Sequence, residues 1–300
     1  SSGGGLRADL TGGEVVNAGR IEAKNATIAG ERVVNLGEIE IDDGSLLMVG
    51  ADAVYLRRFD DPVLIRLPKG SVGTTGSAEG DGAGAAGEPA RYAIENQGRI
   101  DAGRGHVRLA AADPLGFSIR QGSGSAGAPA RIAAKTIELE GGEDGRVQLS
   151  GELDASDASK KGRGGQIDVT GSIIALTDAT VDASGTRGGG QIRIGGEEQG
   201  SGDLQRARAV LVDEATTIRA DATGRGNGGR IIVFSEDLTS VEGDLSARGG
   251  AKGGDGGFVE TSGLARFAIA TAPDVSARRG RAGSWLIDPY DITIQNGRPE

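Results

Sequence analysis

Residues 249–263 read GGAKGGDGGFVETSG, and residues 282–294 read AGSWLIDPYDITI. Within each stretch a glycine precedes one variable residue and then apolar residues in approximate alternation with polar or small ones, over residues 257–261 and 283–287. Such alternation is typical of a β-strand with one buried and one solvated face. The leading glycine permits a backbone turn that a residue with a Cβ resists. The pattern therefore predicts strands joined by turns, without helices between them.

The glycine-led unit recurs along the whole chain. Its copies begin at Gly19, Gly37, Gly44, Gly98, Gly105, Gly145, Gly165, Gly190, Gly229, Gly257 and Gly283. Repetition of a strand-sized unit is typical of a solenoid, in which each coil contacts only its neighbours.

Two series of apolar positions run in phase through the second half of the chain. The first apolar residues of successive units are Ile167, Ile192, Ile231, Val259 and Trp285, separated by 25, 39, 28 and 26 residues. Between them lies a second series, Leu153, Val181, Ile218, Leu245 and Val275, each of which is followed by alternating small or polar residues. Two strands in each repeat, with coils of unequal length, predict an all-β fold, a parallel β-helix with glycine-rich turn excursions.

An asparagine-containing variant of the unit occupies the first hundred residues. Residues 16–19 (VNAG), 34–37 (VNLG) and 95–98 (ENQG) each lead into a strand-like segment, and Asn17 and Asn35 lie one plausible coil apart. Asparagine tolerates the left-handed backbone conformation, and identical amides can stack in a ladder. We expect a stacked turn for this first pair only; the alternative is a set of ordinary asparagine-containing turns.

Composition favours a repetitive β-fold over a compact globule or a disordered chain. Glycine accounts for 55 of the 300 residues and aromatic residues for 3%, yet 37% of residues are hydrophobic and lie in strand register. The net charge of −10 argues against a nucleic-acid-binding protein, which needs a basic surface. Because the chain has no cysteine, disulfides and thiolate metal sites are excluded.

The periodicity predicts one continuous β-helix over residues 1–300, interrupted by loops. Residues 69–90, 121–130 and 197–208 lack a periodic apolar face and are predicted to be flexible insertions. The chain opens with SSGGG and ends with RPE just after a strand-like segment, so we expect it to be a piece of a longer protein.

Few side chains are suited to catalysis or ligand binding. His106 is the single histidine, and its strand position points outward, so neither a Ser-His-Asp triad nor a zinc site is predicted. Asp154, Asp168, Asp182 and Asp221 are candidates for an acid–base cluster, which requires two carboxyl groups at a defined separation. Solvated turns explain the repeated aspartates more simply. The sequence therefore assigns no catalytic, cofactor-binding or metal-binding residue and predicts no cofactor.

Several segments carry a resemblance to a known family. They read IRADA (218–222), GGRIIVF (228–234), LSARGG (245–250), GGDGGFVETSG (253–263) and GSWLIDPYDITI (283–294) and, more weakly, VNLGEI (34–39) and NQGRIDA (96–102). In this order and spacing they resemble the filamentous haemagglutinin-type exoproteins of two-partner secretion, the TpsA-like adhesins. The family's secretion domain carries Asn-Pro-Asn motifs, whereas this chain has no Asn-Pro pair. We therefore expect the chain to lie after the secretion domain or at its end.

The resemblance implies a right-handed parallel β-helix and export through a dedicated outer-membrane transporter. It also implies a secreted protein at the bacterial cell surface, associated with the outer membrane. We expect a non-enzymatic segment of an adhesin-like exoprotein that acts as a rigid stalk or binding surface. Its expected partners are the transporter and a glycan or protein receptor on a host cell or other surface, with lateral self-association also open.

Two alternative functions remain open on the residues alone. The first is a β-helical polysaccharide lyase or hydrolase that uses an Asp/Arg cluster on one face. The second is an extracellular matrix or filament protein whose rods associate through an apolar stripe, for which Ile232, Phe258 and Leu286 are the candidate residues.

Overall fold

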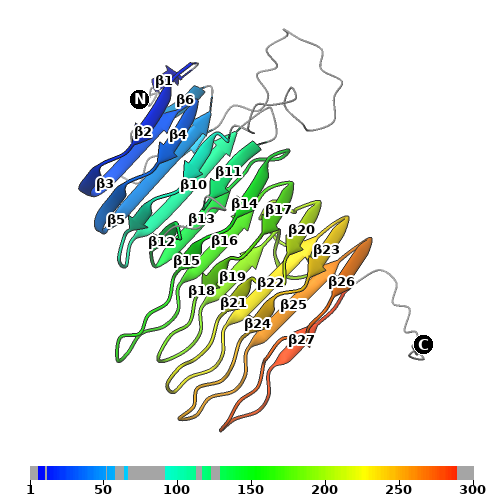
Figure 1. Ribbon diagram of the computed structural model, residues 1–300. Coiled ribbons are helices and arrows are strands. Elements are labelled where there is room, and N and C mark those ends of the chain that lie inside the picture. Colours follow the sequence, from blue (N-terminus) through cyan, green and yellow to red (C-terminus); the bar gives the residue numbers. More distant parts are fainter. Residues whose placement is uncertain are drawn as a thin grey trace, which may run out of the picture.

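The computed structural model describes residues 6–10, 12–51, 53–57, 64–66, 92–112, 117–122 and 129–288. Strands stack along one axis from the N-terminal end, blue in Figure 1, to the C-terminal end, red. Within these ranges the helical structure is a single 3₁₀ turn, η1 (Glu198–Gly200). None of the described residues therefore belongs to a helix of the length and apolar character needed to cross a membrane.

One long face of the stack is a nine-stranded sheet in which every pair is parallel. In spatial order its strands are β2 (Glu14–Asn17), β4 (Arg32–Asn35), β8 (Ile94–Asn96), β11 (Phe117–Gln121), β14 (Arg146–Leu149), β17 (Ile173–Leu176), β20 (Ala209–Val212), β23 (Leu238–Val241) and β26 (Arg266–Ile269).

Two further faces belong to a 15-stranded parallel sheet, and they meet at the long strands β3 (Arg20–Gly30) and β5 (Glu38–Ala51). The first half of β5 pairs with β9 and its second half with β10. One branch then contains β9 (Arg99–Asp101), β12 (Arg131–Ala133), β15 (Glu152–Asp154), β18 (Thr180–Asp182), β21 (Thr217–Arg219) and β24 (Asp244–Ser246). The other contains β10 (His106–Ala112), β13 (Thr136–Glu140), β16 (Gln166–Thr170), β19 (Gln191–Ile194), β22 (Arg230–Ser235), β25 (Phe258–Gly263) and β27 (Ser284–Leu286).

Consecutive strands form one coil, and each coil pairs with the next. Strands β14, β15 and β16 make one coil, and they pair in parallel with β17, β18 and β19 of the following coil. This is the parallel β-helix that the repeats predict. At the N-terminal end, a small antiparallel sheet of β1 (Leu6–Asp9), β6 (Ala53–Arg57) and β7 (Leu64–Arg66) adds a feature for which the repeats give no signal.

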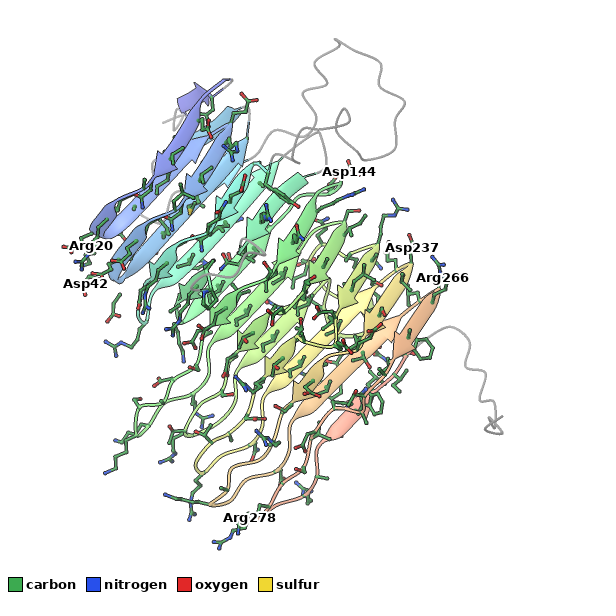
Figure 2. The ribbon with its side chains drawn as sticks, in the orientation of Figure 1. Arg20, Asp42, Asp144, Asp237, Arg266 and Arg278 are labelled. Carbon is green, nitrogen blue, oxygen red and sulfur yellow. The ribbon has the colours of Figure 1, made fainter. Side chains whose placement is uncertain are left out.

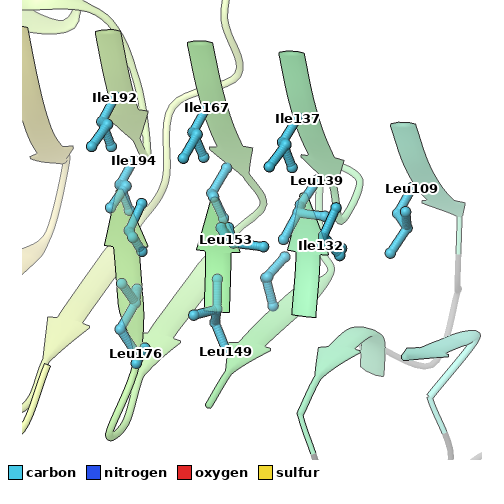
Figure 3. Close-up of a cluster of buried hydrophobic side chains, with 14 of the residues drawn as sticks. Leu109, Ile132, Ile137, Leu139, Leu149, Leu153, Ile167, Leu176, Ile192 and Ile194 are labelled. Atoms are coloured by element: carbon cyan, nitrogen blue, oxygen red, sulfur yellow. The ribbon is translucent and has the colours of Figure 1, made fainter. Parts of the chain in front are cut away.

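Both predicted series of apolar residues are stacked in register inside the helix; Figure 3 shows Ile167 and Ile192 of the first series and Leu153 of the second. Ile167, Ile192, Ile231 and Val259 pair in turn on β16, β19, β22 and β25, and all four are fully buried. The second series, Leu153, Val181, Ile218 and Leu245, pairs likewise on β15, β18, β21 and β24. Each fully buried aliphatic side chain contributes about 1.5–3 kcal/mol, and both series belong to the main hydrophobic core, together with inward residues of the nine-stranded sheet. Trp285 continues the first series and is 37% exposed in the last described coil.

The leading glycines serve close packing of the backbone, not the turn that the sequence suggests. Gly190, Gly229, Gly257 and Gly283 are absent from the residues with positive φ. A Cβ placed on any of them would lie only 2.0–2.1 Å from the carbonyl oxygen of the corresponding glycine one coil earlier. Glycine is required here because neighbouring coils meet backbone to backbone.

The three predicted insertions have different outcomes. Residues 69–90 lie outside the described residues, as do residues 123–128. Gln121, the first residue of the predicted 121–130 loop, instead ends strand β11 and is fully buried. Residues 197–208 contain η1 and lie against the outer face of β22.

Candidate functional surface

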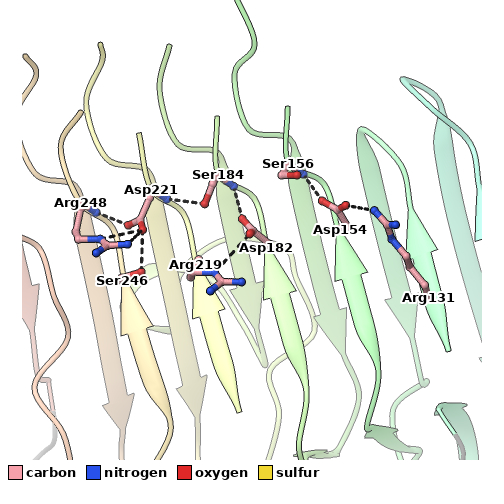
Figure 4. Close-up of polar contacts among 9 residues, drawn as sticks. All are labelled: Arg131, Asp154, Ser156, Asp182, Ser184, Arg219, Asp221, Ser246 and Arg248. Atoms are coloured by element: carbon pink, nitrogen blue, oxygen red, sulfur yellow. Dashed lines mark hydrogen bonds and ion pairs between the residues drawn. The ribbon is translucent and has the colours of Figure 1, made fainter. Parts of the chain in front are cut away.

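Three of the four candidate aspartates lie along one branch of the large sheet (Figure 4). Asp154 on β15 and Asp182 on β18 are directly paired in register, and Asp221 follows β21 two residues after Arg219. Asp168 belongs to β16, on the other branch. The repeat pattern therefore groups Asp154, Asp182 and Asp221 correctly, whereas Asp168 has a separate environment.

Each aspartate in this row pairs with an arginine of a neighbouring coil, and Asp154 and Asp182 also close a local turn. Asp154 accepts a hydrogen bond from the backbone N–H of Ser156 at 2.9 Å and forms an ion pair with Arg131. Asp182 accepts the N–H of Ser184 at 2.7 Å, and its other oxygen lies 3.4 Å from Arg219 Nε. The carboxylates are thus used in turns and in links between coils.

Asp221 has the most complete set of partners in the row and is only 4% exposed. Its Oδ1 accepts the backbone N–H of Arg248 at 2.7 Å, while its Oδ2 accepts Nε and a terminal guanidinium nitrogen of the same arginine at 3.0 and 2.6 Å. The Ser246 hydroxyl donates to Oδ2 at 3.2 Å. The hydrogen bonds and charge of Asp221 raise the pKa of Arg248 further above its usual value. The role of Asp221 is therefore structural, because both of its oxygens are bonded to the next coil.

Asp168 is linked to residues 195–207, which lie over β22 on the same branch of the sheet and are called the covering segment below. The Arg193 guanidinium donates to both carboxylate oxygens of Asp168 at 2.8 Å and also pairs with Glu197, at the start of residues 197–208. The hydrogen bonds with Asp168 raise the pKa of Arg193, and this effect outweighs burial, which lowers it. Asp168 therefore positions an arginine that attaches the covering segment to the sheet.

The covering segment, residues 195–207, encloses apolar side chains on the outer face of β22. Phe234 is fully buried and Ile232 is 2% exposed, although Ile232 was expected to face solvent. A Cβ on Gly200 would lie 2.4 Å from the tip of the Phe234 ring, so the backbone contacts the ring closely. The segment forms a second, smaller apolar cluster outside the coil.

A buried carboxylate fastens the same segment to β25. Glu260 is fully buried, and its two oxygens accept the backbone N–H of Gln199 at 2.9 and 3.2 Å. Gln199 has a φ of 54°, an uncommon conformation for a residue with a side chain. Burial raises the pKa of the Glu260 carboxyl, while these hydrogen bonds oppose the rise.

One hollow of about 270 Å³ on the described surface is lined by the carboxylates of Glu138, Glu140, Asp168 and Asp203, and the first three are paired with basic side chains. His106 Nε2 lies 3.2 Å from Glu138 and lowers the pKa of that carboxyl, and Arg108 pairs with Glu140 at 2.7 Å. Among the described residues there is no group of three His, Asp or Glu side chains arranged to hold a metal ion.

A ladder of side-chain amides runs through the first four coils of the nine-stranded sheet. Asn17 Nδ2 donates to Asn35 Oδ1 at 2.8 Å, Asn35 to Asn96 at 2.7 Å, and Asn96 to Gln121 Oε1 at 2.9 Å. The stacking expected for Asn17 and Asn35 is confirmed, and the ladder extends two residues beyond it. These asparagines lie at the ends of strands and do not have positive φ. The predicted stacking is therefore right, but the left-handed backbone conformation given as its reason is wrong. The spacing Asn-x-Gly, shared by Asn96, was the available signal for the third member.

Comparison with known proteins defines the architecture. The fold is similar to that in the crystal structure of the HMW1 secretion domain from Haemophilus influenzae, with a TM-score of 0.66 and 24% sequence identity. The similarity covers 95% of this chain and 70% of that chain. No protein-family model and no curated protein matches the sequence. The chain therefore belongs, by fold, to the class of parallel β-helices.

Proposed function

We propose that this chain is a non-enzymatic, secretion-domain-type β-helix of a TpsA-like adhesin exoprotein. The observation that carries the proposal is the agreement between the fold and the resembling segments. The HMW1 secretion domain matches over 95% of the chain, and residues 218–263 of the resemblance occupy consecutive coils. Because the match spans most of that domain's structure, it gives no support to a position after the secretion domain.

The partners of the aspartates support a structural role over polysaccharide cleavage. A glycoside hydrolase needs one carboxyl group that donates a proton and a second that stays ionised near the same bond. Asp154, Asp182 and Asp221 form a row, but each is engaged by an arginine and by a backbone N–H. The carboxyl group whose pKa burial raises, Glu260, lies beneath the covering segment.

The outer face gives little support to lateral assembly through an apolar stripe. Ile232 is buried under the covering segment, and the Phe258 ring is covered by Arg230, whose guanidinium carbon lies 4.4 Å from the ring centroid. A stalk or binding surface fits such a polar exterior better. On this proposal the protein is secreted to the cell surface by an outer-membrane two-partner-secretion transporter, and a receptor on another surface is its further partner.

Export by a transporter is the direct test. The full chain, placed behind a periplasmic signal peptide, is produced in a Gram-negative host with and without a two-partner-secretion transporter. We expect the chain in the medium only when the transporter is present, and no release of reducing sugar from a panel of polysaccharides. Retention in the periplasm with every transporter tested, including the one encoded beside its gene, would refute the proposal.

A further inference from the structure

Five loops extend from the coil at its lower edge in Figure 1 and are called the arms below. They comprise residues 156–164, 184–189, 222–228, 249–256 and 276–283. The first four follow β15, β18, β21 and β24, and the fifth precedes β27. Figure 2 places Arg278 at the outer end of the last arm.

The arms carry the opposite charge to the rest of the chain. Their basic residues are Lys160, Lys161, Arg163, Arg187, Arg225, Lys252, Arg278, Arg279 and Arg281, and all nine are exposed. Their acidic residues are Asp157 and Asp255, and Asp255 is paired with Arg281 at 2.8 Å. A chain with a net charge of −10 therefore gathers strong positive charge on one edge.

Backbone hydrogen bonds align four of these residues in a row. The N–H groups of Arg187, Arg225 and Lys252 donate to the carbonyl oxygens of Gly162, Thr186 and Gly224 at 2.7, 3.0 and 2.9 Å. In the parallel pairs of this protein, a residue lies opposite the one that follows its acceptor, as Gln191 does with Gln166. Arg163, Arg187, Arg225 and Lys252 are consequently neighbours on four successive arms, about 4.8 Å apart.

This row differs from other charged residues on neighbouring coils, which are compensated by ion pairs even where like charges lie opposite each other, as Asp154 and Asp182 do. Examples are Arg20 with Glu40, Arg131 with Asp154, Arg219 with Asp182 and Arg248 with Asp221. Within the described part of the chain, the four residues of the basic row have no ion pair with a carboxylate. Like charges directly opposite each other on neighbouring strands are destabilising, so the row has a cost for the free protein.

We infer that the basic row of the arms is a binding surface for a linear acidic polysaccharide. A chain with sulfate or carboxylate groups at regular intervals lies along the row and places one anion near each cation. The backbone hydrogen bonds between the arms hold the Cα positions of the four cations in a row, so binding does not require the backbone of the arms to become ordered. This inference goes beyond the proposed function and does not depend on recognition by a transporter.

The shape and composition of the arms favour a glycan over other polyanions. The arms contain no Phe, Tyr or Trp on which the bases of a single strand could stack. Duplex DNA presents a much denser charge, one per about 1.7 Å, than a single row spaced by coils. An anionic membrane is a plane, whereas the row is an edge that adjoins acidic surface.

Heparin is a suitable probe in titrations of the full chain at physiological salt, and heparin that is both desulfated and carboxyl-reduced is the matched ligand without anionic groups. We expect the wild type to bind heparin and the variant R187Q/R225Q to bind at least tenfold more weakly. The control R206Q/R208Q removes the same charge outside the arms, from arginines that pair with Glu236 and Asp237, and should stay within twofold of the wild type. The charge-preserving variant R187K/R225K should retain binding.

Thermal unfolding of each variant separates binding from folding. Because R187Q/R225Q relieves repulsion, its midpoint should equal or exceed that of the wild type. The inference is overturned if heparin does not bind, if desulfated and carboxyl-reduced heparin binds equally well, or if the control loses as much affinity as the arm variant. Tighter, arm-dependent binding to duplex DNA or to phosphatidylglycerol vesicles would also overturn it and name the other partner class.

Discussion

Arg248 lies one coil after Asp221 and donates three hydrogen bonds to its carboxylate, one from the backbone and two from the guanidinium. The aspartate is 4% exposed, so its charge is balanced almost entirely by this neighbour. The contact joins two coils through side chains just after β21 and β24, where backbone hydrogen bonds from Ala220 to Ser246 and from Ala222 to Arg248 continue between the coils. It therefore adds a side-chain link to the backbone hydrogen bonds at the base of the arms.

Arg248→Ala should lower the free energy of unfolding by about 1–3 kcal/mol, because it leaves a buried carboxylate with fewer partners. Arg219→Ala is the matched control: its contact with Asp182 is 3.4 Å long, and Asp182 is more exposed, so a smaller loss is expected. Urea denaturation of both variants measures the difference. Equal losses would show that the burial of Asp221 is unimportant.

Gly229→Ala should destabilise the coil by about 1–3 kcal/mol, because the added methyl group overpacks a backbone contact. The new Cβ would lie 2.1 Å from the carbonyl oxygen of Gly190. Gly19 holds the same place in the first unit, and nothing lies within 4 Å of its Cβ position, so Gly19→Ala should be neutral or slightly stabilising. Thermal melting of the two variants tests the contrast, and similar midpoints would contradict the packing argument.

Asn35→Ala should cost about 1–3 kcal/mol, since it interrupts the amide ladder and leaves Asn96 with an unsatisfied buried acceptor. Asn35 is fully buried, whereas Asn17 lies at the partly exposed end of the ladder and has a single ladder partner. Asn17→Ala should therefore cost less. Denaturant unfolding measures both, and a larger effect at Asn17 would rule out a cooperative ladder.

Glu260→Gln should become stabilising relative to the wild type as pH rises. Burial raises the pKa of Glu260 in the folded protein, so the folded state holds its proton at pH values where the unfolded chain has lost it. The wild type therefore loses stability between the ordinary pKa of a glutamate and the raised value, and the glutamine variant avoids this loss. Unfolding free energies of both proteins at pH 4.5, 6 and 7.5 give the trend. Exposed Glu242→Gln controls for removal of one charge, and a pH-independent difference between Glu260→Gln and wild type would contradict the prediction.

Phe234→Ala should release the covering segment while leaving the coil folded. Phe234 lies on β22 and is fully buried beneath the segment. Loss of such a side chain typically costs about 3–5 kcal/mol. Amide hydrogen exchange should accelerate at Gln199, whose N–H is held by Glu260, but not at Ile192 or Ile231. Fast exchange at Gln199 already in the wild type would instead support the flexible loop expected from composition.

The strand register was open to prediction because it depends on a period that the residues display. Ile167, Ile192, Ile231 and Val259 recur after the same glycine-led unit, and burial of one face allows a single register. The row of Asp154 and Asp182 follows from the same repeat.

Other features depend on contacts between segments that share no pattern. Burial of Ile232 and Glu260 requires the covering segment, which lies in an irregular part of the sequence. The third face of the coil and the basic row likewise depend on where unequal loops fold back, and sequence spacing does not show that. The ion pairs of the aspartate row were not predictable either, because the repeat does not show which arginine faces each carboxylate.

Coils separated by 25, 39, 28 and 26 residues all return to one register. The extra length is taken up by the covering segment and the arms, and the three strands of each coil keep their places. Insertions and deletions at these points can thus alter what the molecule displays without disturbing how it is built. A lineage of such proteins is free to change its exposed surface quickly while its framework stays the same.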